Sequence, residues 1–341
     1  MESSKANVSS RATPPAAVSD WKPEFWSVID GWRSESEGVV ISADVDGLLS
    51  CALLARETPV NVIGVYTTTH LLLLDGATRD DARRALWLDH DVSQPGIRCV
   101  GQHLVHHHSS NTLPLREVSS FNPNVWQRQA WKESFKGRSG NKRDKFPFGT
   151  CHFIAVATGV DLGDECSEFA ALLAHADGTW RTVVDYRNNA DIWYELMFPN
   201  DAFLLHLRDH WENSAEHLQI HKQVVDKLVG AGVGKNRSRA KIAELLPENK
   251  KELTGRQSIQ YKPKNPKKYI DDIAAVLSYI QNVVGSKVQM GSGISGTVSG
   301  RVETPYPDKI ADFDQFMSDN KIFSHAFTAL RMLRFTTDIV L

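Results

Sequence analysis

The segment GVVISADVDGLLSCALLAR, residues 38–56, contains the transition that decides the fold. It opens with a short apolar run rich in β-branched residues, 38–42, which predicts a buried strand. Asp44 and Asp46 follow at once, and directly after Gly47 comes a stretch with helical apolar spacing, residues 48–56. A strand that passes through an acidic turn into a helix predicts the first half of a β-α-β unit.

Three further apolar runs predict strands at residues 60–66, 71–74 and 85–88. A charged segment, residues 78–84, separates the last two and predicts a short helix or turn. Strands that alternate with helices indicate a parallel sheet with both faces covered. The predicted fold class is therefore α/β, a parallel sheet flanked by helices, with a smaller C-terminal α+β domain.

Changes in apolar pattern, charge and glycine content along the chain indicate where these domains divide. Residues 1–20 lack an apolar core pattern and are expected to form a flexible tail, and an aromatic helical repeat over residues 21–32 begins the main domain. Helices are expected at 148–159, 168–176 and 269–284, and a hairpin or glycine-rich loop at 287–302. The predicted units are a main domain over 21–228, a basic linker over 229–268 and a C-terminal domain over 269–341.

Composition bounds the class of protein. The 341 residues carry a formal net charge of -2, so any nucleic-acid-binding surface has to be local. Four cysteines without a CxxC pair argue against a zinc ribbon or a disulfide framework. No apolar run approaches the ~18 residues that span a bilayer, and the N-terminus has no apolar signal region. We therefore expect a cytoplasmic protein with no membrane partner.

Acidic side chains follow three of the predicted strands. Asp44 and Asp46 come after the first, Asp75 after the run 71–74, and Asp89-His90-Asp91 after the run 85–88. Ligand sites of open α/β sheets lie at the carboxyl ends of the strands. Any one of these clusters is explained more simply by a helix cap or a turn. Three in succession favour a site for Mn²⁺ or Mg²⁺, two ions of which would activate water against a phosphoester.

The order of these motifs resembles the DHH phosphoesterase superfamily, nearest its RecJ-like exonuclease branch. Residues 41–50, ISADVDGLLS, resemble its first motif, and residues 71–76, LLLLDG, the second, a strand that ends in a bridging aspartate. Leu88-Asp89-His90-Asp91 resembles the DHH signature, and Phe121-Asn122-Pro123 the Asn-Pro that commonly follows it. Residues 169–178, FAALLAHADG, resemble the fourth motif, a helix that ends in a metal-binding aspartate. The resemblance covers about residues 36–180 and implies a DHH-like phosphoesterase domain over 21–228 and a substrate-binding domain over 269–341.

The resemblance also implies roles for individual residues. Asp44 and Asp75 would hold one ion, and Asp46, Asp75, His90 and Asp177 the other. The implied catalytic residues are Asp44, Asp46, Asp75, His90 and Asp91, and Asp89 would be structural, orienting its neighbours.

Two departures from the family pattern matter. Ser42 stands where the family usually has an acidic or histidine ligand. Asp91 stands where the second histidine of the signature contacts phosphate, and an anion there would repel phosphate.

Basic and histidine side chains supply candidates for substrate binding. His103, His106, His107 and His108 could donate to phosphate in place of the missing signature histidine, or form a solvated turn. The segment from Lys235 to Lys268 has eleven basic and three acidic side chains, a net +8, and suits phosphate binding or a solvated linker. Gly291 to Gly300 with Arg301 could be a substrate loop, although a plain hairpin explains it as well. The expected substrate-binding residues are His107, His108, Arg143 and Arg301.

These features lead to one main functional hypothesis and two alternatives. The main one is a two-metal phosphodiesterase or nuclease acting on single-stranded nucleic acid, short oligonucleotides or signalling nucleotides, with a homo-oligomer as one expected assembly. The first alternative is a haloacid-dehalogenase-like phosphatase with Asp44 as nucleophile. That family would have an extended loop after the tetrad DVDG, residues 44–47. The second is a degenerate DHH fold that binds nucleotides without cleaving them.

Overall fold

The computed structural model describes residues 20–36, 38–107, 109, 120–127, 145–160, 167–199, 201, 204, 215–233, 245–248, 260–263, 265–329 and 332–341. The expected N-terminal tail, most of the basic linker, and the candidate residues His108 and Arg143 lie outside these ranges.

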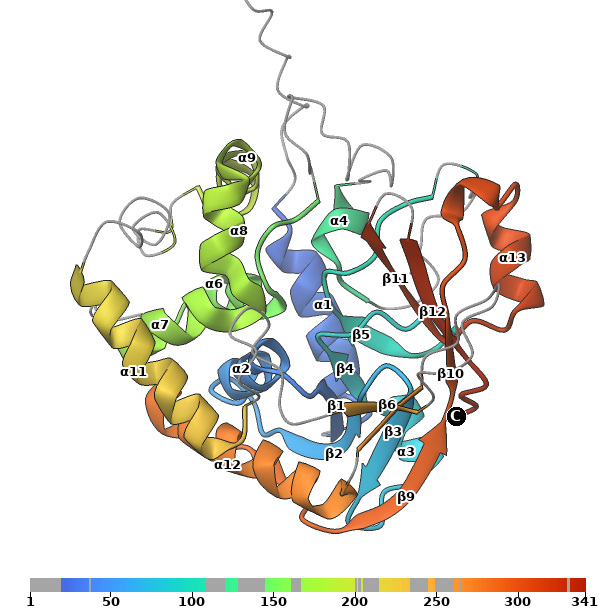
Figure 1. Cartoon of the computed structure of the whole chain (residues 1–341), viewed down its shortest axis with the longest axis horizontal. Helices are drawn as coiled ribbons and strands as arrows, with labels where there is room; N and C mark the ends of the chain where they lie inside the picture. Colours follow the sequence, from blue (N-terminus) through green and yellow to red (C-terminus); the bar gives the residue numbers. More distant parts are fainter. Residues whose placement is uncertain are drawn as a thin grey trace, which may run out of the picture.

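The centre of the molecule is a mixed sheet with helices around it (Figure 1). Its strand order is β5 (Arg98–Val100), β4 (Leu86–Leu88), β1 (Gly38–Ser42), β2 (Asn61–Tyr66), β3 (His70–Leu74) and β9 (Ile294–Ser299). β5, β4, β1 and β2 are parallel, and the short β8 (Gln289–Met290) adds a parallel pairing to β2. The α/β class is confirmed, but the sheet is not purely parallel, because β3 and β9 pair antiparallel.

The direction of β3 is the main difference from the sequence prediction. β2 and β3 form a tight hairpin in which Thr67 N–H donates to the His70 carbonyl at 2.9 Å and Tyr66 pairs with Leu71. Strands in a hairpin run in opposite directions, so the end of β3 returns to the edge where β1 and β2 begin. Asp75, directly after β3, therefore lies at the opposite edge from Asp44 and Asp89.

Helices cover both faces because the strands are apolar on both sides. In β1, Val39 and Ile41 pack into one core and Val40 into the other. The larger core contains apolar side chains from these helices: α1 (Lys22–Arg33), α2 (Val45–Leu54), α6 (Thr150–Thr158), α7 (Glu168–His175), α9 (Arg187–Met197), α11 (Ala215–Ala231) and α12 (Pro266–Val284). Shorter helical segments complete the chain between and beside them: α3 (Arg79–Arg84), α4 (Pro123–Trp126), η1 (Ala176–Gly178) and α8 (Thr179–Asp185).

A smaller antiparallel sheet covers the other side of the molecule. It consists of β10 (Arg301–Glu303), β12 (Met332–Thr337) and β11 (Ser324–Ala329), and it packs with η2 (Pro307–Lys309) and α13 (Phe313–Asp319). A separate pair, β6 (Leu245–Glu248) and β7 (Gln260–Pro263), lies within the expected linker. The main sheet crosses the predicted boundary at residue 268, because β8 and β9 belong to it.

Two smaller sequence predictions concern cysteines and membranes. Cys51, Cys99 and Cys151 are buried free thiols, and Cys166 lies outside the described ranges. Among the residues that the structure describes, no helix combines the length and apolar character needed to cross a membrane.

Candidate active site

The first turn of α2 fixes Asp44 at the carboxyl end of β1. Asp44 is extended and caps the helix, since its Oδ1 accepts from Gly47 N–H at 3.1 Å. Ser42 Oγ lies 2.8 Å from the same Asp44 oxygen. A Cβ at position 47 would overlap Ser42 Oγ, so glycine is required for this close approach. The Asp-x-Asp-Gly spacing therefore holds Ser42 and Asp44 together at the edge of the sheet.

Asp46, in the first turn of α2, is buried against the start of α6. Its two carboxylate oxygens accept from the backbone N–H groups of Thr150 and Cys151, each at 2.8 Å. The N-terminus of a helix favours negative charge, because its first N–H groups have no partner within the helix. Gly149 makes this possible, since a Cβ there would stand only 2.7 Å from Asp46 Oδ2.

Asp89 enters the same cluster from the end of β4. Its backbone has a positive φ of 58°, which turns the chain out of the strand. One carboxylate oxygen lies 2.7 Å from Ser42 Oγ, and the other accepts from Thr150 Oγ1 at 2.8 Å and faces His103 Nε2 at 3.4 Å. Asp89, expected to be structural from the resemblance, thus touches the centre of the acidic cluster.

Asp91 plays a different part. Its buried carboxylate accepts from His103 N–H at 2.7 Å, Leu104 N–H at 3.3 Å and the Asn122 amide at 2.9 Å. Burial raises its pKa, and the charge of His103 and the hydrogen bonds from Asn122 and His103 N–H oppose the rise. Asp91 therefore organises the loop after β5 and places the His103 ring over Asp89.

Asp177 completes the cluster from the fourth motif. It sits in η1 between α7 and α8 with a positive φ of 50°, and its Oδ2 accepts from the Gln102 amide at 3.0 Å. Its charge is among those that raise the pKa of Asp46, which places it close to that carboxylate. Gln102 and His103 are adjacent, so a single loop contacts both Asp177 and Asp89.

The electrostatics of the cluster are dominated by crowded negative charge. Burial and then the charges of Asp89, Asp177 and Asp44 raise the pKa of Asp46 well above its usual range. Burial acts to raise the pKa of Asp89 as well, but hydrogen bonding and the charge of His103 hold it below its ordinary value. Burial works to lower the pKa of His103, and the contact with Asp89 raises it overall. A cation at this position would relieve the repulsion.

Asp75 does not belong to this cluster. The antiparallel β3 puts it near the start of β2, and the six residues of β2 span roughly 20 Å. Its carboxylate accepts from Gly293 N–H at 2.7 Å and Ser292 N–H at 3.3 Å, beside the loop before β9. The structure therefore does not bring Asp75 together with Asp44 and Asp46, as the predicted bridge between two metal ions requires.

The other predicted residues are placed as follows. The His90 ring packs edge-on against Tyr66 and Trp87, at centroid distances of 4.9 and 6.2 Å. His107 is fully buried and stacks on Phe313 at 4.7 Å, a packing position that does not suit contact with substrate. Arg301 donates to Asp338 at 2.6 Å on the small sheet.

The donor types in the cluster fit a hard divalent cation. Carboxylate oxygens with a nearby imidazole are ligands that Mg²⁺ and Mn²⁺ accept. Over the described ranges, no three His, Cys, Asp or Glu side chains already converge in ligating positions. The carboxylates are instead held by protein donors, and each retains lone pairs beyond those donors. Asp44, Asp46, Asp89 and Asp177 are therefore the residues that would hold the ion.

Sequence reasoning missed Thr150 and Gln102 and did not single out His103 from its neighbours. His103 follows β5 by three residues, and recognition of the strand 98–100 would have placed it at the carboxyl edge. Comparison with protein-family models gives no match, and comparison with curated proteins gives none either. The case for function therefore depends on the geometry of this edge.

Proposed function

We propose that the protein is a divalent-cation-dependent phosphoesterase of DHH type that hydrolyses phosphodiester bonds in single-stranded nucleic acid, short oligonucleotides or nucleotides. Asp44, Asp46, Asp89 and Asp177 form the cation site, and Mn²⁺ or Mg²⁺ is the ion. Compared with the set that the resemblance implies, Asp75 and His90 are left out, Asp89 is added, and one cation site replaces two. His103 takes the phosphate-facing role that Asp91 cannot fill.

The observation that carries this proposal is the position of the Ser42 hydroxyl. Ser42 Oγ lies 2.8 Å from Asp44 Oδ1 and 2.7 Å from Asp89 Oδ2. A hydroxyl has one hydrogen to donate, so it can satisfy only one of two ionised carboxylates. The remaining oxygen pair repels unless a proton or a cation lies nearby. Asp46 and Asp177 add further negative charge, which favours a divalent ion over a single proton.

The side chains divide the chemistry between them. A bound divalent cation supplies a water of lowered pKa and neutralises charge on the phosphate. Asp46 is held rigidly by the α6 N–H groups, and Asp89 by Thr150 and Ser42, so the carboxylates need little rearrangement. His103 is about one-third exposed, and contact with Asp89 favours its protonated form. It can therefore donate a charged hydrogen bond to a phosphate oxygen.

The alternatives fit this geometry less well. A haloacid-dehalogenase-like phosphatase expects a loop after the tetrad, whereas α2 begins at Val45 and Asp44 is used as its cap. It also gives no part to Asp89 or Asp177. A binding module without cleavage keeps the same cation site, so kinetics separate it from the main proposal.

The test compares two aspartates at opposite edges of the sheet. The wild type, Asp89→Asn and the matched control Asp75→Asn are incubated with Mn²⁺ and a panel of single-stranded DNA, RNA, dinucleotides and cyclic nucleotides. Thermal melting checks that each variant is folded. We expect Asp89→Asn to lose at least ~100-fold in rate, as for loss of an electrostatic group in a site, and Asp75→Asn to stay within about twofold, as is usual away from a site. Equal losses in both variants, or no Mn²⁺-dependent cleavage by the wild type, would overturn the proposal.

A further inference from the structure

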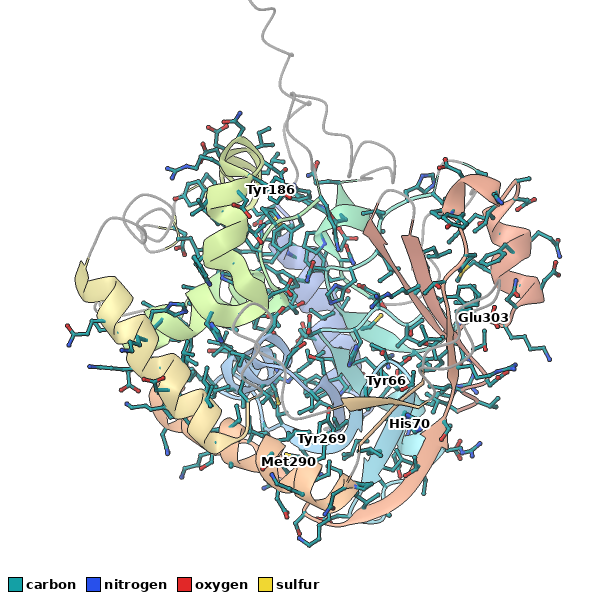
Figure 2. The ribbon with its side chains drawn as sticks, in the orientation of Figure 1. Tyr66, His70, Tyr186, Tyr269, Met290 and Glu303 are labelled. Carbon is teal, nitrogen blue, oxygen red and sulfur yellow. The ribbon has the colours of Figure 1, made fainter. Side chains whose placement is uncertain are left out.

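Tyr269 is a buried phenol on the side of α12 that packs against α2. It is 3% exposed and belongs to the same core as the α2 side chains (labelled in Figure 2). Across the described part of the chain, its hydroxyl has no hydrogen-bond partner. Burial raises the pKa of this phenol and the charge of Asp44 raises it further, so the Asp44 carboxylate lies within electrostatic reach of Tyr269. Asp44 caps α2, and α12 passes beside that helix (Figure 1).

A second tyrosine on the same helix shows what an ordinary structural phenol looks like. Tyr279 lies ten residues further along α12, and its hydroxyl donates to Glu168 Oε2 at 2.9 Å. Tyr279 therefore ties α12 to α7. A buried hydroxyl without a partner is unfavourable, since it has lost its water and gained nothing in return. Phenylalanine would fill the space of Tyr269 without that penalty.

We propose that Tyr269 is a positioning residue that donates a hydrogen bond to Asp44 when that carboxylate holds the cation. This inference rests on the proposed function, because it assigns Asp44 to a cation site. Side chains that bond to metal ligands orient them and strengthen the metal site, and their loss typically weakens metal affinity by about 10- to 100-fold. Through Tyr269, the helix that precedes β8 and β9 contributes to a site built by the N-terminal part of the sheet.

Tyr269→Phe and the matched control Tyr279→Phe test this inference. Mn²⁺ affinity is measured by titration calorimetry and the metal-free unfolding midpoint by thermal melting. We expect Tyr269→Phe to weaken Mn²⁺ binding by about 10-fold or more, with an unchanged or higher metal-free midpoint. We expect Tyr279→Phe to keep the wild-type Mn²⁺ affinity and to melt a few degrees lower, because its hydrogen bond to Glu168 is lost.

The outcomes distinguish the proposed role of Tyr269 from the proposed phosphoesterase activity on which it rests. A wild type that binds Mn²⁺ and cleaves, together with a Tyr269→Phe variant of equal Mn²⁺ affinity, overturns the role of Tyr269 and leaves the phosphoesterase proposal standing. A lower metal-free midpoint for Tyr269→Phe with normal affinity would show that the phenol is only structural, and also overturns it. A wild type that neither binds Mn²⁺ nor cleaves overturns both.

Discussion

Gly149→Ala should break the contact between Asp46 and α6 with little other disturbance. Gly149 has φ -77° and ψ 168°, a conformation that alanine adopts freely, so backbone strain is not at issue. The added Cβ would meet all three atoms of the Asp46 carboxyl group, at 2.7 to 2.8 Å. Ordinary contacts begin at 3.4 Å, so the carboxylate has to retreat by 0.7 Å.

The size of the effect follows from the two hydrogen bonds at stake. Each joins Asp46 to an α6 N–H at 2.8 Å, and the retreat takes both to the limit of a hydrogen bond. Hydrogen bonds to a charged group contribute roughly 1.5 to 3 kcal/mol each. Allowing for partial relaxation, we expect Gly149→Ala to lower the free energy of unfolding by about 3 kcal/mol.

Urea denaturation of four variants measures this effect: Gly149→Ala, Gly31→Ala, Asp46→Ala and the double variant Asp46→Ala/Gly149→Ala. Gly31→Ala is the matched control, because Gly31 lies inside α1 and an added Cβ would stand 3.5 Å from Arg98 Nε, which is an ordinary contact distance. The same substitution there should raise stability by about 0.5 to 1 kcal/mol. In an Asp46→Ala background the cost of Gly149→Ala should nearly vanish. An unchanged cost in that background would refute the claim that Asp46 fills the space beside Gly149.

Three further predictions concern pH, packing and strain. Burial lowers the pKa of His152 and His175 to about 4 and of His325 to about 3. Below pH 6.5 these three histidines are therefore protonated in the unfolded chain and remain neutral in the folded protein. The free energy of unfolding should fall between pH 6.5 and 4 by up to about 4 kcal/mol per pH unit. Equal urea midpoints at pH 7 and 5.5 would contradict this. Phe313→Ala should cost about 3 to 5 kcal/mol, because a buried ring that stacks on His107 is lost, and a loss under 1 kcal/mol would show that the site collapses. Thr68→Gly should raise stability by about 1 kcal/mol, because a β-branched residue at φ 70° is strained, and chemical denaturation that shows a loss would argue that the Thr68 side chain has a role of its own.

Much of the α/β framework could be predicted because burial leaves a clear trace in the sequence. Residues 38–42 and 60–66 are continuous apolar runs, and both form strands within a residue of the expected bounds. The direction of residues 71–74 could not be predicted in the same way. An apolar run has no direction, and the hairpin turn at Thr67-Thr68-Thr69 lacks the glycine or asparagine that usually marks a two-residue turn. The structure instead places Thr68 at a positive φ, held by hydrogen bonds from Tyr66 and Thr336 to its carbonyl.

The candidate site was predictable where a residue follows its strand directly. Asp44, Asp46 and Asp89 come within four residues of the ends of β1 and β4, so the carboxyl-edge rule places them together. Asp75 follows its strand just as closely and lies at the other edge, since the rule depends on strand direction. His103 could not be chosen from its histidine-rich neighbourhood, because His107 is distinguished from it by stacking on Phe313 of α13, a contact between residues far apart in the sequence.

Ser42 and Asp91, the two departures from the DHH pattern that the sequence resembles, each have a defined structural role. Asp91 in place of the second signature histidine would repel phosphate if it faced the substrate. Its carboxylate instead faces inward and accepts from His103 and Leu104 N–H and from Asn122. That arrangement places the His103 ring next to Asp89, so the loop after β5 supplies an imidazole beside the acidic cluster. Ser42, in place of a ligand, has a hydroxyl between Asp44 and Asp89 that keeps both carboxylates at the edge. Replacing Asp91 with histidine should therefore damage the site, because no imidazole can accept three hydrogen bonds at once.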